Sequence, residues 1–441
     1  MLKIGCLLLT AVLVAPLWSQ VEPSASGGDY TADDESRMIT PPPVSGQVYP
    51  TRFGAERPQN HLAAGLVFTA AYVDNLLVGN TPTSDETYSV LPTFSLERDT
   101  HRQRQVISYG AGFTLYQHTS SLNSVAQNAS VNYQYHFTKY ASINIQDSFN
   151  QNTNAFNQPN PFSNAGVPGG IPAGSPALVN PYGNQIANTT SAGLAYQYGR
   201  NAMIGGGGSY SFVHYQDVEQ YTDINNSNAV GGTFFYTRRL TPRQYLGGIY
   251  RFAEIQTNPV DSTTTTNAIY GFYTLFLNHM FTLSFQGGPQ HFNASQPPNP
   301  DVAAWTPSFN GSIAYRTQRV NIAASYARVV TGGGGLVGAY HSNEGNLSAG
   351  RLFTRTWSAG VSGSYYNFNS ATPIFTPLNE GGHSWAVNVS VQHTFREFLN
   401  AEAGYGHFHQ SYTGITSVSS MPDSNRAYFS ISYKYTRPLG R

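Results

Sequence analysis

Charged side chains are scarce in this sequence, and three of them stand where they could select among charged ligands: Arg251, Glu402 and Lys434. Each lies on the polar side of a stretch in which polar and apolar residues alternate. If the stretches that hold Glu402 and Lys434 pair as a hairpin, position 402 lies opposite about position 432, and the two charges become diagonal neighbours. We therefore expect a salt bridge that either stabilises a wall or acts as a selectivity element.

Hydroxyl and amide side chains share the polar side of the alternating stretches. The clearest of them are Asn132, Gln134, Ser284, Gln286, Asn321, Ser362, Asn388 and Ser390. Such groups hydrogen-bond water and neutral polar molecules without selecting a strong charge. They predict a polar lining and not a catalytic centre.

Other residue combinations indicate chemistry less clearly. His407 and His409 share one side of a stretch, as two metal ligands can, but Ala403 and Tyr405 lie on the same apolar side. We interpret the two histidines as part of an aromatic belt. The sequence thus predicts no catalytic residues, no cofactor and no metal site. An enzyme with a Ser–His or paired-acid site remains a minor alternative.

Two glycine runs also lack the chemistry that their composition suggests. Neither 205–208 nor 332–335 is followed by the Lys-Ser/Thr pair of a phosphate-binding loop. The first predicts a kink or close packing inside a strand, and the second a mobile external loop.

The alternation itself predicts strands, because side chains on a strand point to opposite faces in turn. In the stretch from Trp385 to Phe395, for example, Val387 and Val389 alternate with Asn388 and Ser390. Eighteen such stretches are expected, at 61–73, 85–97, 104–117, 126–138, 140–149, 188–199, 201–216, 226–238, 243–256, 263–277, 279–293, 304–316, 318–330, 340–353, 355–368, 381–394, 398–411 and 423–436. Each is long enough to cross a bilayer at barrel tilt, for which about 9 to 11 residues suffice. The fold class predicted is an all-β, up-and-down transmembrane β-barrel.

The connections predict which way the barrel faces. Those after the even-numbered strands are short, and those after the odd-numbered strands are longer and rich in Pro, Asn, Gly and Ser. Outer-membrane barrels have short periplasmic turns and longer external loops. Both ends of the chain are therefore expected in the periplasm. Whether the Pro-rich connection 150–187 folds into the lumen or stands clear of it is left open.

Several short turns carry an aromatic residue followed by a cation, as in Phe137-Thr-Lys139 and Phe353-Thr-Arg355. Aromatic rings favour the membrane boundary and cations the headgroups beyond it. The outer-membrane lipids are thus expected partners, with a functional basic rim as the alternative.

Residues 1–20 read as a signal peptide, with one lysine followed by an apolar stretch too short to span a membrane. Residues 21–60 have no periodicity and are interpreted as a flexible periplasmic segment, a plug or a partner-binding strand being the alternative. The barrel then occupies 61–441. The single cysteine, Cys6, lies in the signal, so disulfide and thiol chemistry are not expected.

The composition fits this assignment. Charged residues make up 10% of the 441 residues and aromatics 13%, whereas a soluble domain has about 25% charged residues. The net charge is zero, so nucleic-acid binding has no electrostatic support.

The segment Ala70-Ala-Tyr-Val-Asp-Asn-Leu76 resembles the opening of the outer-membrane β-barrel porin superfamily, which includes barrels linked to exopolysaccharide secretion. The resemblance implies a channel or export role and assembly by the barrel assembly machinery. The last strand differs from the usual outer-membrane ending, because it finishes with Pro-Leu-Gly-Arg441 and not with Phe.

These observations favour a channel in the bacterial outer membrane for passive diffusion of small polar or sugar-like solutes. The alternatives are a conduit for a secreted polysaccharide and a structural or adhesive surface barrel with a closed lumen. The solute, the gating and the oligomeric state are not predicted.

Overall fold

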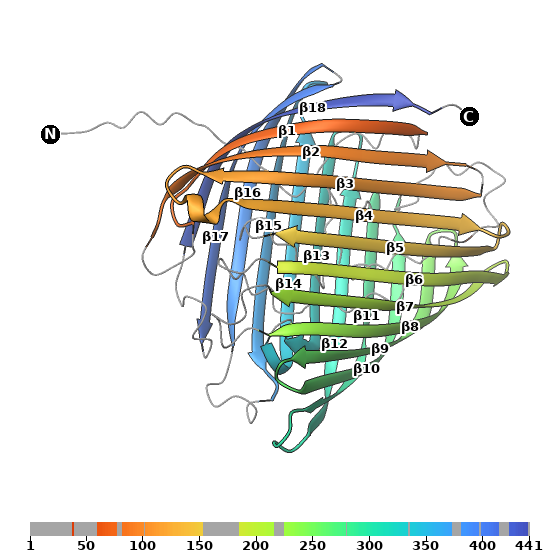
Figure 1. Cartoon of the computed structure of the whole chain (residues 1–441). Coiled ribbons are helices and arrows are strands. Elements are labelled where there is room, and N and C mark those ends of the chain that lie inside the picture. The colour runs from red at the N-terminus through yellow and green to blue at the C-terminus, as the bar shows by residue number, and fades with distance from the viewer. Residues whose placement is uncertain are drawn as a thin grey trace.

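The computed structural model describes Met38 and residues 60–76, 82–100, 102–152, 185–215, 225–278, 280–333, 336–372, 381–396, 398–413 and 423–439. They form one antiparallel sheet of 18 strands, in which neighbours along the chain pair and β1 closes against β18 (Figure 1). The strands are β1 (His61–Val73), β2 (Asp85–Asp99), β3 (Gln103–Tyr116), β4 (Ser124–His136), β5 (Ala141–Asn152), β6 (Gln185–Gly199), β7 (Ala202–Tyr215), β8 (Asn226–Thr241), β9 (Gln244–Asn258), β10 (Ser262–Phe276), β11 (Phe281–Ser295), β12 (Val302–Arg316), β13 (Val320–Gly333), β14 (Leu336–Leu352), β15 (Trp357–Ser370), β16 (Gly381–Arg396), β17 (Leu399–Thr413) and β18 (Asp423–Pro438). A 3-10 turn, η2 (Ser120–Leu122), follows β3.

The predicted fold class is confirmed, and each predicted strand has its counterpart. The largest difference is at β13 and β14, where 331–339 was expected as a loop. Instead β13 continues to Gly333 and β14 begins at Leu336. The Pro-rich connection is predicted at 150–187, but β5 extends to Asn152 and β6 begins at Gln185, and 153–184 lies outside the described residues.

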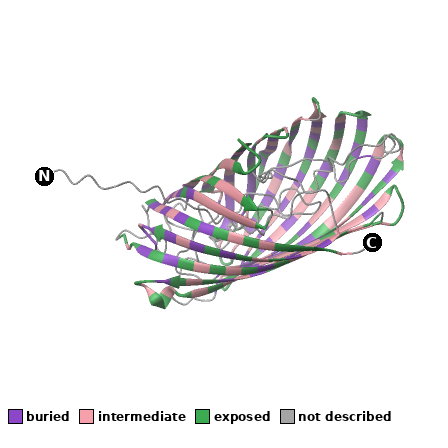
Figure 2. Ribbon diagram, turned by 90° about the horizontal axis from the view of Figure 1, so that it is seen from above, coloured by how far each residue is buried: buried purple, intermediate pink, exposed green. Residues whose placement is uncertain are grey.

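Exposure alternates along the strands as the sequence predicts (Figure 2). On β16, Val387, Val389 and Val391 are exposed on the outer face, whereas the polar residues between them are half-buried on the inner face. Most large side chains that remain exposed are apolar and lie on this outer face of the strands. Because no edge is left open at β1 and β18, the barrel can carry an apolar exterior through a bilayer.

The segment that resembles the porin opening closes the barrel. The Asp74 carboxylate accepts hydrogen bonds from the backbone N–H (2.7 Å) and the side-chain amide (2.6 Å) of Asn425 at the start of β18. Asn75 donates its side-chain amide to the Asp423 carbonyl, and its own carbonyl accepts from the Ser424 hydroxyl. These four bonds join β18 to the residues that follow β1.

A repeated pair of side chains marks the outer face near the middle of the strands. On odd-numbered strands an outward tyrosine donates its hydroxyl to an amide oxygen on the next strand, always two residues from the tyrosine's direct partner. The pairs are Tyr109–Gln127, Tyr210–Asn228, Tyr250–Asn267, Tyr326–Asn343 and Tyr405–Asn425. We call these tyrosines the tyrosine girdle.

The amide of every girdle pair lies toward the external end of the barrel, where the long connections are. Tyrosine favours the boundary between lipid and water, with its hydroxyl in the water. At the opposite end, outward Phe137, Tyr198, Phe353 and Phe395 are exposed beside the short turns. Over most of the wall the apolar band of the exterior therefore lies between the girdle and the turns, whereas on β3 exposed Phe113 and Leu115 carry it further toward the external end. Among the described residues no helix combines the length and apolar character needed to cross a membrane.

A buried carboxylate fastens the connection between β3 and β4 to the wall. Asp85, 1% exposed at the external end of β2, accepts hydrogen bonds from the backbone N–H groups of His118 (3.0 Å) and Thr119 (2.8 Å) and from the Thr119 hydroxyl. Burial raises the pKa of Asp85, but the hydrogen bonds from Thr119 and His118 outweigh it and hold the pKa below its usual range.

The lowered pKa of Asp85 predicts loss of this fastening in acid. A depressed pKa contributes stability above the ordinary aspartate value of about 4, and that stability disappears as the pH falls below it. Hydrogen exchange at the His118 and Thr119 amides should accelerate over this range, and Asp85→Asn should accelerate it already at neutral pH. Asp99→Asn, at the other end of β2, is the control. Equal protection in the two variants at pH 7 would contradict the role of Asp85.

Candidate functional site in the barrel lumen

The wall of the barrel divides at one place. β11 and β12 pair along their whole length, but β12 pairs with β13 only from Phe309 to Arg316. Beyond Arg328, β13 leaves the wall with β14 still paired to it, and this external part of the hairpin contacts the inner faces of β10 and β11. We call residues 329–333 and 336–341 the inner hairpin.

Side chains replace the backbone pairing that the inner hairpin gives up. Gln290 on β11 donates its side-chain amide to the Val330 carbonyl (2.6 Å) and accepts from the Val330 N–H (2.9 Å). The Ser308 hydroxyl donates to the Arg328 carbonyl (2.9 Å). Both Gln290 and Val330 are fully buried. Because a buried backbone group needs a partner, these residues fix where β13 bends.

Gln290 should therefore be required for the position of the inner hairpin. Gln290→Leu leaves two buried backbone groups unpaired, each at a cost of about 1–3 kcal/mol. We expect lower stability in urea unfolding and faster hydrogen exchange at Val330. Gln286→Leu is the matched control, since Gln286 is equally buried on the same face and its side-chain oxygen has no partner among the described residues. If the two variants were equally stable, Gln290 would not hold the hairpin.

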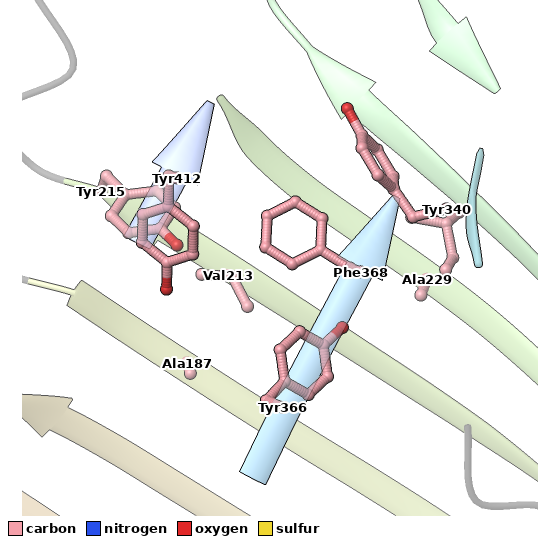
Figure 3. Close-up of a cluster of buried hydrophobic side chains, with 9 residues drawn as sticks. Ala187, Val213, Tyr215, Ala229, Tyr340, Tyr366, Phe368 and Tyr412 are labelled. Atoms are coloured by element: carbon pink, nitrogen blue, oxygen red, sulfur yellow. The ribbon is translucent and has the colours of Figure 1, made fainter. Parts of the chain in front are cut away.

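The inner hairpin contributes to an aromatic cluster that crosses the lumen (Figure 3). Tyr340 of the hairpin lies 5.7 Å from Phe368 on β15, measured between ring centroids, and Phe368 lies 5.6 Å from Tyr412 on β17. The complete cluster is Ala187, Val213, Tyr215, Ala229, Ile255, Tyr340, Tyr366, Phe368 and Tyr412. Its members come from β6 to β9 and from β14, β15 and β17, so it joins walls that do not pair with each other. We call it the aromatic constriction.

Hydrogen bonds and close packing hold the constriction in place. The Ser342 and Tyr366 hydroxyls lie 2.8 Å apart, and the Tyr340 hydroxyl donates to the Val337 carbonyl (3.0 Å). A Cβ at Gly332 would stand 2.9 Å from the Ile255 side chain, so the hairpin reaches β9 only because this residue is glycine. The interpretation of Gly332 as part of a mobile loop is therefore wrong, because it lies in β13 and is buried.

The other glycine run behaves as predicted. A Cβ at Gly205 would lie 2.4 Å from the ring of Phe235, its direct partner on β8. The ring occupies the space that the glycine leaves, which is the close packing within a strand that the sequence indicates.

The residues predicted as a polar lining share the inner face with the constriction. Ser284 and Gln286 are buried there, and Asn132, Gln134, Asn321, Ser362, Asn388 and Ser390 are half-buried. Ser364 lies on the same face of β15, two residues from Tyr366 on the periplasmic side, and it is exposed. The inner face is therefore polar and open on the periplasmic side of the constriction.

The predicted charges also lie on the inner face, but not as the expected pair. The register places Ser430, and not position 432, opposite Glu402, so Lys434 is four residues from the direct partner. At about 3.3 Å per residue this separates the two backbone positions by about 13 Å along the strand. The predicted register is wrong by two residues, and the diagonal salt bridge loses its geometric basis.

Arg251, predicted as a lumen charge that could select among ligands, packs instead against an aromatic ring of the wall. Its guanidinium lies over the ring of Tyr270 on β10, 5.6 Å from the centroid, and its Nε is buried with no hydrogen-bond partner in the described part of the chain. The Tyr270 hydroxyl in turn lies 3.0 Å from that of Ser308, beside the bend of β13. Arg251 therefore belongs to the support of the inner hairpin.

The sequence analysis missed several inward charges, of which Arg426 and Glu344 are two. Arg426 on β18 is buried with its guanidinium 5.3 Å from the centre of the Tyr428 ring. Glu344 on β14 accepts a hydrogen bond from the Asn346 amide (2.8 Å). The alternation places Arg426 on the same side as Lys434, and Glu344 on the same side as Ser348, so the signal was present in both strands.

The segment before the barrel contributes one described residue to the lumen. Met38 is 2% exposed and donates its backbone N–H to the Gln197 side-chain oxygen (2.8 Å). It packs in a cluster with Met203, Phe235 and Tyr245 on the inner wall. At Met38 the chain thus contacts the inner wall of the barrel. The signal peptide and the remainder of the predicted flexible segment lie outside the described residues, apart from Asn60.

The histidines lie on the outer face, as the sequence indicates. His407 and His409 lie 4.6 and 5.8 Å from the Trp385 ring, and their Nδ1 atoms are hydrogen-bonded to Asn425 and Asp423. Within the described ranges, no three His, Cys, Asp or Glu residues are grouped as metal ligands.

No protein-family model matches the chain, and no curated protein does. Among solved structures, OccAB4 of Acinetobacter baumannii aligns with 10% identity over 86% of this chain and 99% of that one, with a TM-score of 0.41. OpdK of Pseudomonas aeruginosa, solved with vanillate, aligns with 10% identity over 85% of this chain and 99% of that one, with a TM-score of 0.41. The ferric citrate transporter FecA aligns with 10% identity over 86% of this chain and 79% of that one, with a TM-score of 0.45. The fold assignment does not depend on these alignments, since the strand pairing of the chain itself defines a closed 18-stranded barrel.

Proposed function

We propose that the protein is an outer-membrane channel for small polar solutes, whose external half is narrowed by the aromatic constriction. The observation that carries the proposal is the change along the inner face from exposed Ser364 to buried Tyr366 and Phe368 on one strand. A barrel of this size can hold a water-filled passage. The polar face below the constriction then favours neutral hydrogen-bonding solutes, and the constriction sets their size.

A structural barrel with a closed lumen is the second candidate. The observation in its favour is that the constriction joins opposite walls through fully buried rings. A conduit for a secreted polysaccharide ranks below both, because a polymer needs a wide continuous passage and the constriction narrows it.

Planar-bilayer recording on the purified full-length protein separates the channel from the closed barrel. The channel predicts discrete openings of low conductance and liposome swelling that falls steeply with solute size. A silent wild-type protein that also stays silent when the constriction is truncated would favour the closed barrel.

Glu402 gives a further test of the inner face. If solutes pass the periplasmic side of the lumen, Glu402→Gln removes a negative charge from their path and should shift the reversal potential in a salt gradient toward anion preference. Asp147→Asn is the control, because Asp147 lies on the outer face, where it accepts from Asn188 and Thr190. An unchanged reversal potential would leave Glu402 with a structural role.

A further inference from the structure

The division of the wall also creates a hollow on the outer face. Its volume is about 740 Å³, and its lining is mostly apolar: Phe285, Gly287, Gly288, Pro289, Trp305, Thr306, Pro307, Ser308 and Phe309. A hollow of this size falls within the range of small-molecule sites, about 300–1,000 Å³. Trp305 is 67% exposed, the most of any large apolar side chain in the described part of the barrel.

The hollow begins at the tyrosine girdle. Phe309 in its lining lies 5.6 Å from the ring of Tyr326, a girdle residue. From there it extends along β11 and β12 toward the external end, where Trp305 stands 5.0 Å from His291. The hollow is therefore continuous with the lipid-facing band at its periplasmic end and reaches the headgroup level at its external end.

One side of the hollow is an open strand edge. Residues 302–308 of β12 have no β13 partner among the described residues. An open edge does not lie in hydrocarbon, because its backbone groups would stay unsatisfied, so the edge requires a polar neighbour. Pro307, which has no N–H, also makes the edge unsuitable for pairing with a second chain.

A cation stands where the edge begins. Arg328 is the direct partner of Phe309, it is exposed on the outer face with Tyr326, and it makes no ion pair with a described residue. An apolar hollow with a cation and an open strand edge beside it is complementary to an anionic amphiphile. The guanidinium is well suited to a phosphate.

We propose that this hollow binds lipopolysaccharide of the outer leaflet, with an acyl chain against Phe285 and Phe309, a phosphate at Arg328 and a headgroup sugar against Trp305. The lipid then seals the wall from outside where β12 and β13 separate. The site is independent of whether solutes pass through the lumen.

Trp305 reports directly on the occupant. In a variant with Trp18, Trp357 and Trp385 replaced by Phe, Trp305 is the sole tryptophan. Addition of lipopolysaccharide to this protein in detergent should shift its emission to the blue in a saturable manner. Arg328→Gln should weaken the apparent affinity about tenfold, as the loss of one charged hydrogen bond predicts. Gly287→Leu, which fills the hollow, should abolish the shift.

Controls distinguish the other occupants. Arg351→Gln changes an exposed cation at the opposite end of β14 and should bind as the parent does. An equal shift with phosphatidylglycerol vesicles, insensitive to Arg328→Gln, would overturn the assignment to lipopolysaccharide. So would a shift that follows protein dimerisation in cross-linking, or no shift at all in a variant that melts like the wild type.

Discussion

Truncating two rings of the constriction should increase the conductance of the barrel severalfold. In Tyr340→Ala combined with Phe368→Ala, two fully buried side chains that lie 5.7 Å apart in the lumen are lost. A wider and wetter passage conducts more ions and admits larger solutes. The measurements are single-channel conductance and the size limit in liposome swelling. Because truncating a buried Phe costs about 3–5 kcal/mol, heat-modifiable migration must first show that the variant is folded.

Tyr365→Ala is the matched control for this result. Tyr365 precedes Tyr366 on β15 but points outward and is 47% exposed. Its loss should leave conductance unchanged. If the double variant conducted no better than Tyr365→Ala, the constriction would not limit passage.

An arginine on the lipid-facing side of β16 should destabilise the barrel nearly as much as the truncation of a buried ring. Val391 is 40% exposed in the apolar band, two residues on the turn side of the position opposite Tyr405 of the girdle. Val391→Arg should lower the free energy of unfolding by about 2–4 kcal/mol, the cost of arginine near the middle of a bilayer. Urea unfolding in lipid vesicles measures the difference.

Gln392→Arg offers the same side chain on the other face of β16. Gln392 lies inward and directly opposite Glu402, so the new cation meets water and a carboxylate. Asn388→Arg, on the same inward face, is less suitable because the Asn388 side-chain oxygen is buried. Equal destabilisation by Val391→Arg and Gln392→Arg would show that the inward and outward faces are wrongly assigned.

The barrel itself could be predicted from the sequence because each strand carries its own signal. Val387 and Val389 alternate with Asn388 and Ser390 whatever the neighbouring strand does, and short turns such as Phe137-Thr-Lys139 mark the strand ends locally. Register is a different kind of information. Register depends on the pairing of two strands. An estimate from the loop between β17 and β18 placed position 432 opposite Glu402, two residues from its true partner, Ser430.

The constriction could not be predicted because no local pattern reports it. The inner hairpin continues the alternation of β13 and β14, so its sequence does not indicate that it leaves the wall. The departure is visible only in the structure, where the Gln290 side chain on β11 bonds the backbone N–H and carbonyl of Val330. Tyr366 and Phe368 could have been assigned to the inner face from Ser362 and Ser364, but not their contact with Tyr340 across the lumen.

The closure by Asp74 has a consequence for the order of assembly. It bonds a residue 351 positions further along the chain, and β1 finds its second neighbour only in the last strand. Such remote pairing makes contact order high and folding slow. Both edges of the sheet, at β1 and at the last strand formed, therefore stay unpaired until β18, the final strand of the described barrel, has been made.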